Sequence, residues 1–467
     1  MRNRESILFF ICLFAASPLF AADPVVAGLE STSPEVFNPP KIKTHVFDNG
    51  LKLYFLENRE LPVVEMSALI KVGSVDDPGD KKGLTNFMMS GIRTGGGGGR
   101  DGDQFDEELE KMAAQIRVDA KKEFSTMKLS ILSQDFVAGA SLFFDLLKNP
   151  RFEPGKLELV RDRLLDAIQR RNEDPDEIAS REFSQQLFGE ESVWARVSTA
   201  ETVGSITRDE IRQFFESRVK PGITWLSVSG DISFSELKKV LGPLVSDWKG
   251  ENPPPRPESK LAKEWVPSFQ LISRPANQAA VMMGHFGDKR FNPDKYPLIL
   301  ANYILGGSTF GSRLGNRIRT ALGLAYTVYS DFGLDTDYGR FYIAAGTKAP
   351  ALVIEEAKKI LQGMTRDFTE KELEDAKNTI LNQLVFQYED PFEIVETEVR
   401  YRFYGYPADY LTLFQKEIKK VTLDQLKGVV GRYFFPDRMK ILVVGDPSLK
   451  GELKKLGRVE DLPLDND

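Results

Sequence analysis

Hydrophobic and polar residues follow two different periods along this chain, which predicts both helices and strands. In segments 157–172 and 373–388 the apolar residues recur at spacings of three and four, as they do on the buried face of an amphipathic helix. Segment 43–56 instead contains two alternating runs on either side of Asn49-Gly50, the pattern of a β-hairpin. Helices and strands are therefore interspersed.

Two helix starts are each followed by an apolar run that predicts a buried strand. A hydroxyl residue with a carboxylate or amide residue three positions later forms a capping box, which satisfies free backbone N–H groups at the helix start. The two boxes are Thr207 with Glu210 and Thr422 with Gln425, and the strands that follow are 223–229 and 439–444. The same order of elements thus occurs twice.

An internal repeat covers most of the chain. Glu173-Asp174-Pro175 recurs 216 positions later as Glu389-Asp390-Pro391, and segment 152–158 resembles segment 368–374 at the same offset. Solenoid repeats have periods of ~20 to 50 residues, so this much longer period indicates a duplicated domain.

We place the two homologous halves at residues 40–250 and 265–455. Between them, the segment 251–264 contains Asn252-Pro253-Pro254-Pro255-Arg256-Pro257 and is predicted to be a stiff linker. The interspersed helices and strands favour an α+β architecture with one mixed β-sheet per half and helices packed on one face of each sheet.

Residues 1–22 have the pattern of a secretory signal peptide. Arg2 and Arg4 precede the apolar run 7–16, and Ala21-Ala22 supply small residues for cleavage. This predicts an exported, periplasmic protein. Cys12 is the only cysteine, so the mature chain contains no disulfide and must be stabilised by its core.

Charge and hydropathy exclude two classes of partner. The 62 basic and 69 acidic residues give a formal net charge of −7, which disfavours a protein that binds the nucleic-acid backbone or an anionic membrane surface. After the leader, no segment is long and apolar enough to span a bilayer. We expect neither nucleic acid nor a membrane span.

Three conspicuous segments are interpreted as structural. Gly95–Gly99 lacks the Lys-Ser/Thr of a phosphate-binding loop and is predicted to be a flexible loop. The acids within 106–110 are expected on the solvated face of an amphipathic helix. The aromatic residues within 403–406 are expected to pack in the core and its loops.

Histidine is scarce. His45 and His285 are the only two, each in a strand-like run, and each is predicted to be an ordinary packed or surface imidazole. A catalytic zinc typically has three protein ligands from His, Glu, Asp and Cys, so a self-contained zinc enzyme is not expected. No G-x-S-x-G pattern indicates a serine hydrolase.

Two segments carry a resemblance to a known family. Asn49-Gly50-Leu51-Lys52 and residues 83–90, Gly-Leu-Thr-Asn-Phe-Met-Met-Ser, resemble the amino-terminal half of the pitrilysin-type inverted-zincin peptidases, in particular the mitochondrial processing peptidase-like branch. Active members read G-L-A-H-F-L-E-H there, with two histidines on zinc and a glutamate that activates water. The resemblance places Asn86, Met89 and Ser90 at those three positions.

The fourth position of the family motif is a glutamate ligand on a later helix. By its distance from Ser90 and from Glu173-Asp174-Pro175, it aligns with Asp166. With all four positions changed, the resemblance implies a chain without zinc, other cofactor or catalytic residue of its own.

The second half retains more of the family pattern. Segments 306–314 and 319–326 are similar to the family's glycine-rich stretch and to its substrate-binding Arg/Tyr pair, here Arg319 and Tyr326. The resemblance implies that Arg319 binds a peptide carbonyl or carboxylate and that Tyr326 donates to the scissile carbonyl. The alternative is that the two residues only cap a helix and pack a strand.

The resemblance therefore predicts a non-catalytic, substrate-binding subunit of a two-chain zinc metallopeptidase that acts on unstructured peptides. A zinc-binding inverted-zincin chain would be its partner in a heterodimer, and the two homologous halves would form a clam-like chamber. Whether the chain contributes to an enzyme depends on that partner. Two alternatives remain: a non-enzymatic scaffold of the respiratory core-protein type, and a divergent hydrolase in which Asp166 and other carboxylates bind a hard metal.

Overall fold

The computed structural model describes residues 37–256, 265–308 and 311–464. The predicted signal peptide of residues 1–22, including Cys12, lies outside the described residues, as do residues 257–264 of the predicted linker. In the described ranges, no helix is both long and apolar enough to cross a bilayer.

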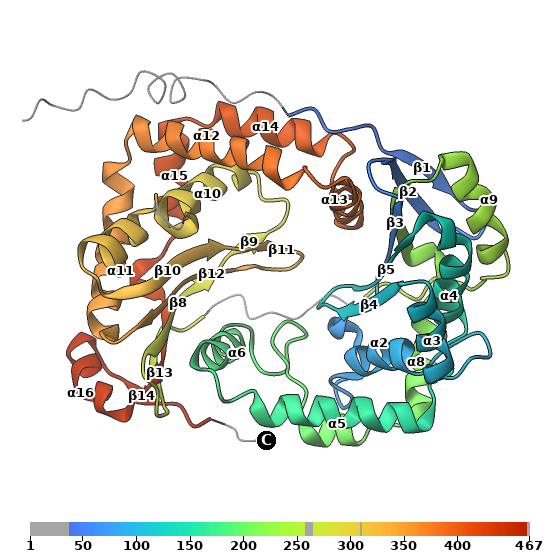
Figure 1. Cartoon of the computed structure of the whole chain (residues 1–467). Helices are drawn as coiled ribbons and strands as arrows, with labels where there is room; N and C mark the ends of the chain where they lie inside the picture. The colour runs from blue at the N-terminus through green and yellow to red at the C-terminus, as the bar shows by residue number, and fades with distance from the viewer. Residues whose placement is uncertain (1–36, 257–264, 309–310, 465–467) are drawn as a thin grey trace, which may run out of the picture. The chain divides into compact units, whose positions relative to one another are not determined.

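Helices and strands are interspersed in both halves (Figure 1). The first half contains strands β1 (Lys43–Val46), β2 (Lys52–Glu57), β3 (Val63–Ile70), β4 (Gln115–Ala120), β5 (Ser125–Leu132) and β6 (Thr224–Gly230), and helices α2 (Leu84–Thr94), α3 (Gly102–Lys111), α4 (Phe136–Lys148), α5 (Pro154–Arg170), α6 (Pro175–Phe188), α7 (Ala200–Gly204), α8 (Arg208–Arg218) and α9 (Phe234–Val245). The second half contains strands β7 (Ser268–Ser273), β8 (Ala279–Phe286), β9 (Asp288–Lys289), β10 (Ala325–Phe332), β11 (Leu334–Asp335), β12 (Arg340–Thr347), β13 (Lys440–Gly445) and β14 (Glu460–Asp461), and helices α10 (Lys295–Asn302), α11 (Pro350–Asp367), α12 (Glu370–Gln387), α13 (Pro391–Phe403), α14 (Tyr410–Lys420), α15 (Leu423–Tyr433) and α16 (Lys450–Leu453).

The local predictions are confirmed. The segments with helical periodicity form α5 and α12, and the apolar runs after the capping boxes form β6 and β13. Thr207 accepts a hydrogen bond from the backbone N–H of Glu210, and Thr422 accepts one from that of Gln425, so both boxes are formed. In α3 the apolar residues Phe105 and Leu109 are buried.

Five strands of each sheet share one topology, which confirms the duplication. The two strand orders are β1-β2-β6-β3-β5-β4 and β10-β12-β8-β13-β7-β14. The parallel pair β2 with β6 of the first sheet corresponds to β7 with β13 of the second, and the strands beyond these pairs toward β4 and β10 are antiparallel. The second sheet has a further parallel pair, β7 with its edge strand β14. Strands β2, β3 and β6 therefore correspond to β7, β8 and β13.

The predicted hairpin at Asn49-Gly50 connects β1 and β2. Gly50 has a φ of 87°, in the left-handed region that glycine adopts most readily. The Asn49 side chain accepts a hydrogen bond from the backbone N–H of Leu51 at 3.1 Å and donates to the Val245 carbonyl at 2.8 Å. The turn is thus tied to the end of α9.

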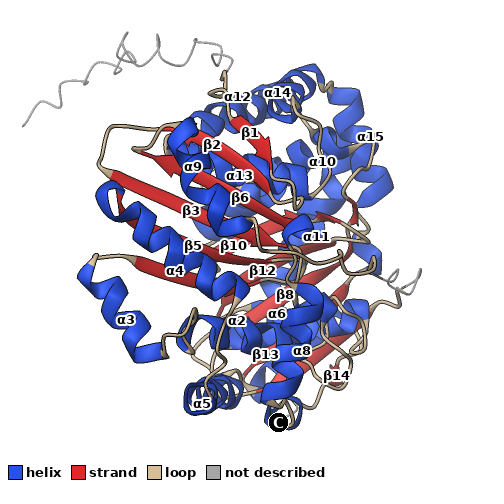
Figure 2. Ribbon diagram, turned by 90° about the vertical axis from the view of Figure 1, so that its right-hand side faces the viewer, coloured by secondary structure: helices blue, strands red, loops and turns tan. Residues whose placement is uncertain are grey.

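Each sheet is covered on its second face by a helix from the opposite half. Helix α6 belongs to the first half but packs against β8 and β13 of the second sheet, and α13 packs against β6 and β2 of the first sheet (Figure 1). Figure 2 shows α4, by contrast, lying over the sheet of its own half, where it packs against β5. The sequence predicted helices on one face of each sheet, and the exchange adds cover on the other.

The two exchanged contacts differ in chemistry. Helix α6 places Ile178, Phe183 and Leu187 in one apolar cluster with residues of the second sheet such as Met282 and Leu442. Complete burial of such side chains stabilises the fold by ~1.5–3 kcal/mol each relative to exposure.

Helix α13 meets a more polar sheet face. Glu396 of α13 is almost fully buried and accepts an ion-pair hydrogen bond from Lys128 of β5 at 2.5 Å. Ser67, which pairs with Lys128 across the sheet, and Ser227, which pairs with Ser67, are buried as well. This contact therefore depends on a charge pair as well as on apolar packing.

The five consecutive glycines form a packed turn, not the flexible loop predicted from sequence. Gly95, Gly96 and Gly97 are buried at the end of α2, and Gly96 has a φ of 73°. A Cβ at Gly98 would lie 2.2 Å from the Asp145 carboxylate. A Cβ at Gly96 would likewise lie 2.4 Å from the Arg100 carbonyl oxygen, so glycine is needed at both positions.

Candidate functional site

Helix α2 carries three of the four positions at which the family motif is changed. Asn86 is exposed in the first turn, Met89 is 1% exposed in the core of the first half, and Ser90 is partly buried. Asn86 and Ser90 are four residues apart and so share a face of the helix. None of the three side chains supplies a carboxylate or an imidazole to that face.

Asp77 holds the start of α2. Its carboxylate accepts hydrogen bonds from the backbone N–H groups of Gly83 and Thr85, both at 2.8 Å, and from the Thr85 hydroxyl at 2.5 Å. These are the donors that a helix leaves unsatisfied in its first turn. Burial raises the pKa of Asp77 to about 6, while the three hydrogen bonds and the charge of Arg196 oppose that rise.

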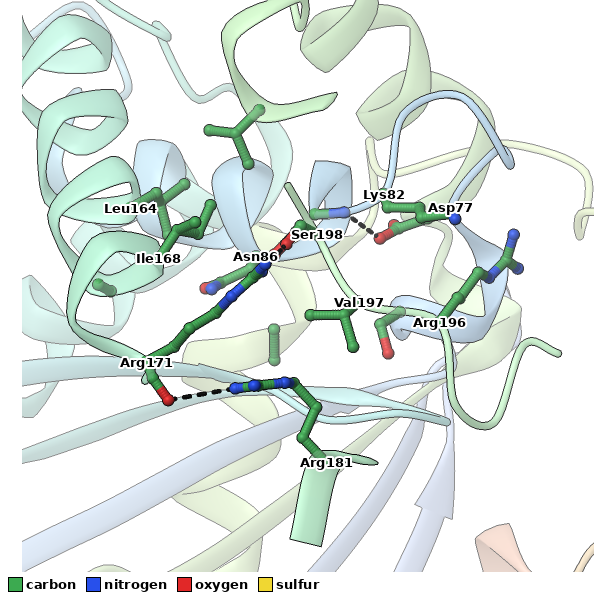
Figure 3. Close-up of a pocket in the computed structure, with 15 residues that line it drawn as sticks. Asp77, Lys82, Asn86, Leu164, Ile168, Arg171, Arg181, Arg196, Val197 and Ser198 are labelled. Atoms are coloured by element: carbon green, nitrogen blue, oxygen red, sulfur yellow. Dashed lines mark hydrogen bonds between the residues drawn. The ribbon is translucent and has the colours of Figure 1, made fainter. Parts of the chain in front are cut away.

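A hollow of about 420 Å³ lies beside Asn86 (Figure 3). Most of its walls come from the start of α2, the second half of α5, the middle of α6 and the segment 196–198. The lining residues are Ser74, Asp77, Lys82, Gly83, Asn86, Ala120, Leu164, Ala167, Ile168, Arg171, Arg181, Arg196, Val197, Ser198 and Val203. Asp166 is exposed on α5 and is not among them, whereas its neighbour Ala167 is.

Cationic side chains dominate the hollow. Arg171 donates from Nη1 to the Ser198 carbonyl at 2.7 Å, and Figure 3 shows its side chain extending from the end of α5 toward Asn86. Arg181 of α6 donates to the Arg171 carbonyl at 3.1 Å. Lys82 and Arg196 also line the hollow.

These side chains do not fit a zinc ion. Zinc in proteins is bound by imidazole, thiolate and carboxylate groups, and the hollow offers an amide, hydroxyls and guanidinium groups beside one carboxylate that caps a helix. Throughout residues 37–256, 265–308 and 311–464, no group of three His, Cys, Asp or Glu side chains is placed to hold a metal ion.

The two histidines lie in different sheets, and His285 is a packed residue, as predicted. It is fully buried in β8, where its Nδ1 donates to the Phe286 carbonyl at 2.7 Å and its Nε2 accepts from the backbone N–H of Phe435 at 3.1 Å. Burial lowers the pKa of His285 to about 4, so the ring is neutral at physiological pH. His45 in β1 packs its ring against Phe47 at 4.8 Å.

Arg319 and Tyr326 of the second half lie together. Arg319 belongs to the π-helical segment Gly315–Ala321, and its Cζ atom lies 5.3 Å from the centre of the Tyr326 ring. Tyr326 is 78% exposed near the start of β10, at the edge of the second sheet. The Tyr326 phenol is therefore exposed beside the partly buried Arg319, and neither residue lines the hollow beside Asn86.

No local pattern in the sequence indicates the cationic hollow. Arg171, Arg181 and Arg196 are spread over 26 positions among many other charged residues. They are brought together by the turn from α5 to α6 and by the loop that returns past Ser198.

Family models match both halves. Residues 55–199 match the model described as insulinase (peptidase family M16), and residues 205–380 match the model described as peptidase M16 inactive domain. The chain belongs to the M16 peptidase family. The family predicted from sequence is thereby confirmed, whereas the mitochondrial processing peptidase-like branch stays a prediction.

Curated relatives of the chain are named both as zinc proteases and as a non-peptidase homologue. The Bacillus subtilis "uncharacterized zinc protease YmxG" is 24% identical over 411 residues, which cover 86% of this chain and 98% of that protein. The Helicobacter pylori "non-peptidase homolog YmxG" is 26% identical over 342 residues, which cover 70% of this chain and 76% of that protein. With its four changed motif positions, this chain is an inactive member of the family.

Solved structures of the family share the fold. The crystal structure of a peptidase M16 inactive domain from Pseudomonas fluorescens has a TM-score of 0.78 at 25% identity, with 87% of this chain and 98% of that chain covered. An M16-like peptidase from Alicyclobacillus acidocaldarius has a TM-score of 0.73 at 16% identity, with 88% and 100% covered. The predicted α+β fold with two homologous halves is confirmed.

Proposed function

We propose that this chain is the non-catalytic, substrate-binding subunit of a zinc metallopeptidase whose catalytic subunit is a second chain. The observation that carries the proposal is the contrast between the two halves. In the first half, Asn86, Met89 and Ser90 offer neither a zinc ligand set nor a base, while in the second half Arg319 and Tyr326 lie together and are accessible.

The Arg319–Tyr326 pair suits the binding of a peptide carbonyl. A guanidinium supplies a planar fork of N–H donors, and a phenol supplies one further donor from a stiff ring. In a complex with an active M16 chain, these groups would lie over a peptide while the partner's zinc and carboxylate perform hydrolysis. The partner would complete a heterodimer around unstructured peptide substrates, with the chamber between the two homologous halves as the binding space.

We further propose that this chain and its catalytic partner act outside the cytoplasm. The basic, apolar and small-residue regions of residues 1–22 support export to the periplasm. Mass spectrometry of the protein from the periplasmic fraction of its host should find a mature start near Ala22 or Asp23. A cytoplasmic chain that retains Cys12 would contradict export.

Tyr326→Phe tests the substrate-binding role. The change removes one exposed hydroxyl, so folding and pairing should be preserved. If the hydroxyl stabilises the transition state, turnover of a quenched peptide by the reconstituted pair should fall ~10²- to 10³-fold.

Tyr329→Phe is the matched control, because Tyr329 is a partly exposed tyrosine of the same strand. It should leave turnover close to that of the unmodified pair. Normal turnover with Tyr326→Phe, in a complex that forms normally, would instead support the non-enzymatic scaffold.

A further inference from the structure

The hollow beside Asn86 carries an excess of positive charge. Four cationic side chains line it, those of Lys82, Arg171, Arg181 and Arg196, against the single carboxylate of Asp77. In active members of the family this helix face holds a metal dication. Here the positive charge comes from side chains.

The one carboxylate is already engaged. Asp77 accepts three hydrogen bonds from Gly83 and Thr85 at the start of α2, and its side chain is buried. With a pKa of about 6, Asp77 still carries most of its negative charge near neutral pH. Asp77 therefore serves the helix start and offsets at most one of the four positive charges.

Acidic residues outside the hollow neutralise only part of the positive charge of its lining. Lys82 pairs with Glu191 at 3.6 Å, and Arg181 pairs with Glu182 at 2.9 Å. Arg196 donates to the Val75 carbonyl at 3.3 Å, and its charge interacts with the Asp77 carboxylate. Its Nε is buried without a hydrogen-bond partner among the described residues, so this guanidinium retains an unused donor.

The other lining residues suit a small polar group that is carried on an apolar or peptide chain. Leu164, Ile168 and Val197 provide apolar wall, while Asn86 and Ser198 provide polar groups near Arg171. The volume of about 420 Å³ admits one or two side chains of a peptide. A planar carboxylate matches the fork of a guanidinium better than a point anion does.

We propose that this hollow is an anion site that binds a carboxylate group of a peptide, on an acidic side chain or at the C-terminus. The choice of a peptide as the bearer rests on the proposed function. The anion site itself rests on the charges, the burial and the shape of the hollow. The site would let the chain prefer acidic peptides without any metal.

Fluorescence anisotropy with the full mature chain and no partner tests the proposal. Three labelled octapeptides of otherwise equal sequence are compared: one with internal Asp and Glu and an amidated end, one neutral with a free C-terminal carboxylate, and one neutral and amidated. At least one of the first two should bind roughly 10- to 100-fold more tightly than the third, as expected for hydrogen bonds to a charged group. Added salt should weaken that binding.

Two variants locate the site. Asn86→Asp keeps the shape of an exposed side chain but adds a negative charge, and Arg171→Gln removes a positive one, so each should weaken binding of the preferred peptide about 10-fold or more. Arg163→Gln is the matched control, because Arg163 is exposed on α5 and does not line the hollow. It should bind like the unmodified chain.

Equal affinity for all three peptides, no binding of any, or unchanged binding by Asn86→Asp would overturn the anion site. Asn86→Asp remains decisive even if Arg171→Gln fails to fold. Because no partner is present, the outcome is independent of the turnover assay with Tyr326→Phe. The binding assay can thus support the anion site while the turnover assay contradicts the subunit role. The opposite combination of results is equally possible.

Discussion

At the scale of single residues, function and stability depend on which charges are exposed and which are buried. Asn86 faces a hollow that contains guanidinium groups, while Met89 has become part of the core. Ala167, on the wall of that hollow, cannot bind a metal, and Asp166 is exposed and does not line it. The alternative of a hard-metal hydrolase built on Asp166 gains no support from this geometry.

We therefore expect the purified chain to contain no stoichiometric zinc and to cleave no unstructured peptide by itself. Elemental analysis after mild dialysis measures the metal, and a quenched peptide measures hydrolysis. A zinc content near one per chain, together with peptidase activity that a chelator abolishes, would contradict the inactive assignment.

His285 should make the fold sensitive to acid. Its pKa is about 4 in the folded chain and about 6.5 when unfolded, so the unfolded state binds the proton first as the pH falls. The stability that the neutral ring provides is complete above pH ~6.5 and is lost as the pH falls toward about 4, with a loss of about 2 kcal/mol between pH 7 and pH 5.

Urea unfolding at pH 7 and pH 5 measures this effect. His285→Gln should reduce the pH dependence of the unfolding free energy by about that amount, whereas His45→Gln, the other histidine, should not. An equal pH dependence in the His285 variant would show that other groups cause the acid sensitivity.

At the scale of elements, the exchange of α6 and α13 makes each sheet depend on the other half. Strand β8 is buried along its entire length because α6 covers the face that α11 does not. The same helix carries Arg181 to the hollow beside Asn86, so one element serves both the second sheet and the site.

Phe183→Ala should destabilise the chain by ~3–5 kcal/mol, because it removes a fully buried ring of α6 from the cluster on the second sheet. Hydrogen exchange should accelerate in β8 and β13, although the mutation lies in the first half. Phe386→Ala removes a ring that is 71% exposed on α12 and should change stability by less than ~0.5 kcal/mol. Faster exchange confined to the first half would contradict the exchanged packing.

At the scale of the whole molecule, the two halves are homologous in sequence and topology but are not independent in packing. Without α6, the second sheet would expose Ala280, Met282, Phe286 and Val444 on one face. An apolar surface of this kind favours aggregation of an isolated half.

Separate expression of residues 37–256 and 265–464 tests this dependence. The second fragment alone should bind a hydrophobic dye and aggregate, and co-expression with the first fragment should yield a soluble complex. A second fragment that is monomeric and folded by itself would show that α6 is dispensable.

The sequence by itself determined the elements, the duplication and the family. Helical periodicity, the capping boxes at Thr207 and Thr422 and the turn at Asn49-Gly50 are set by residues close in the chain, so they could be predicted. The tertiary structure alone decided that α6 and α13 cover the opposite sheets, that the glycines at 95–99 form a packed turn, and that three distant arginines gather beside Asn86. These contacts join segments far apart in the chain, and which of them form depends on the packing of the entire core rather than on local preference.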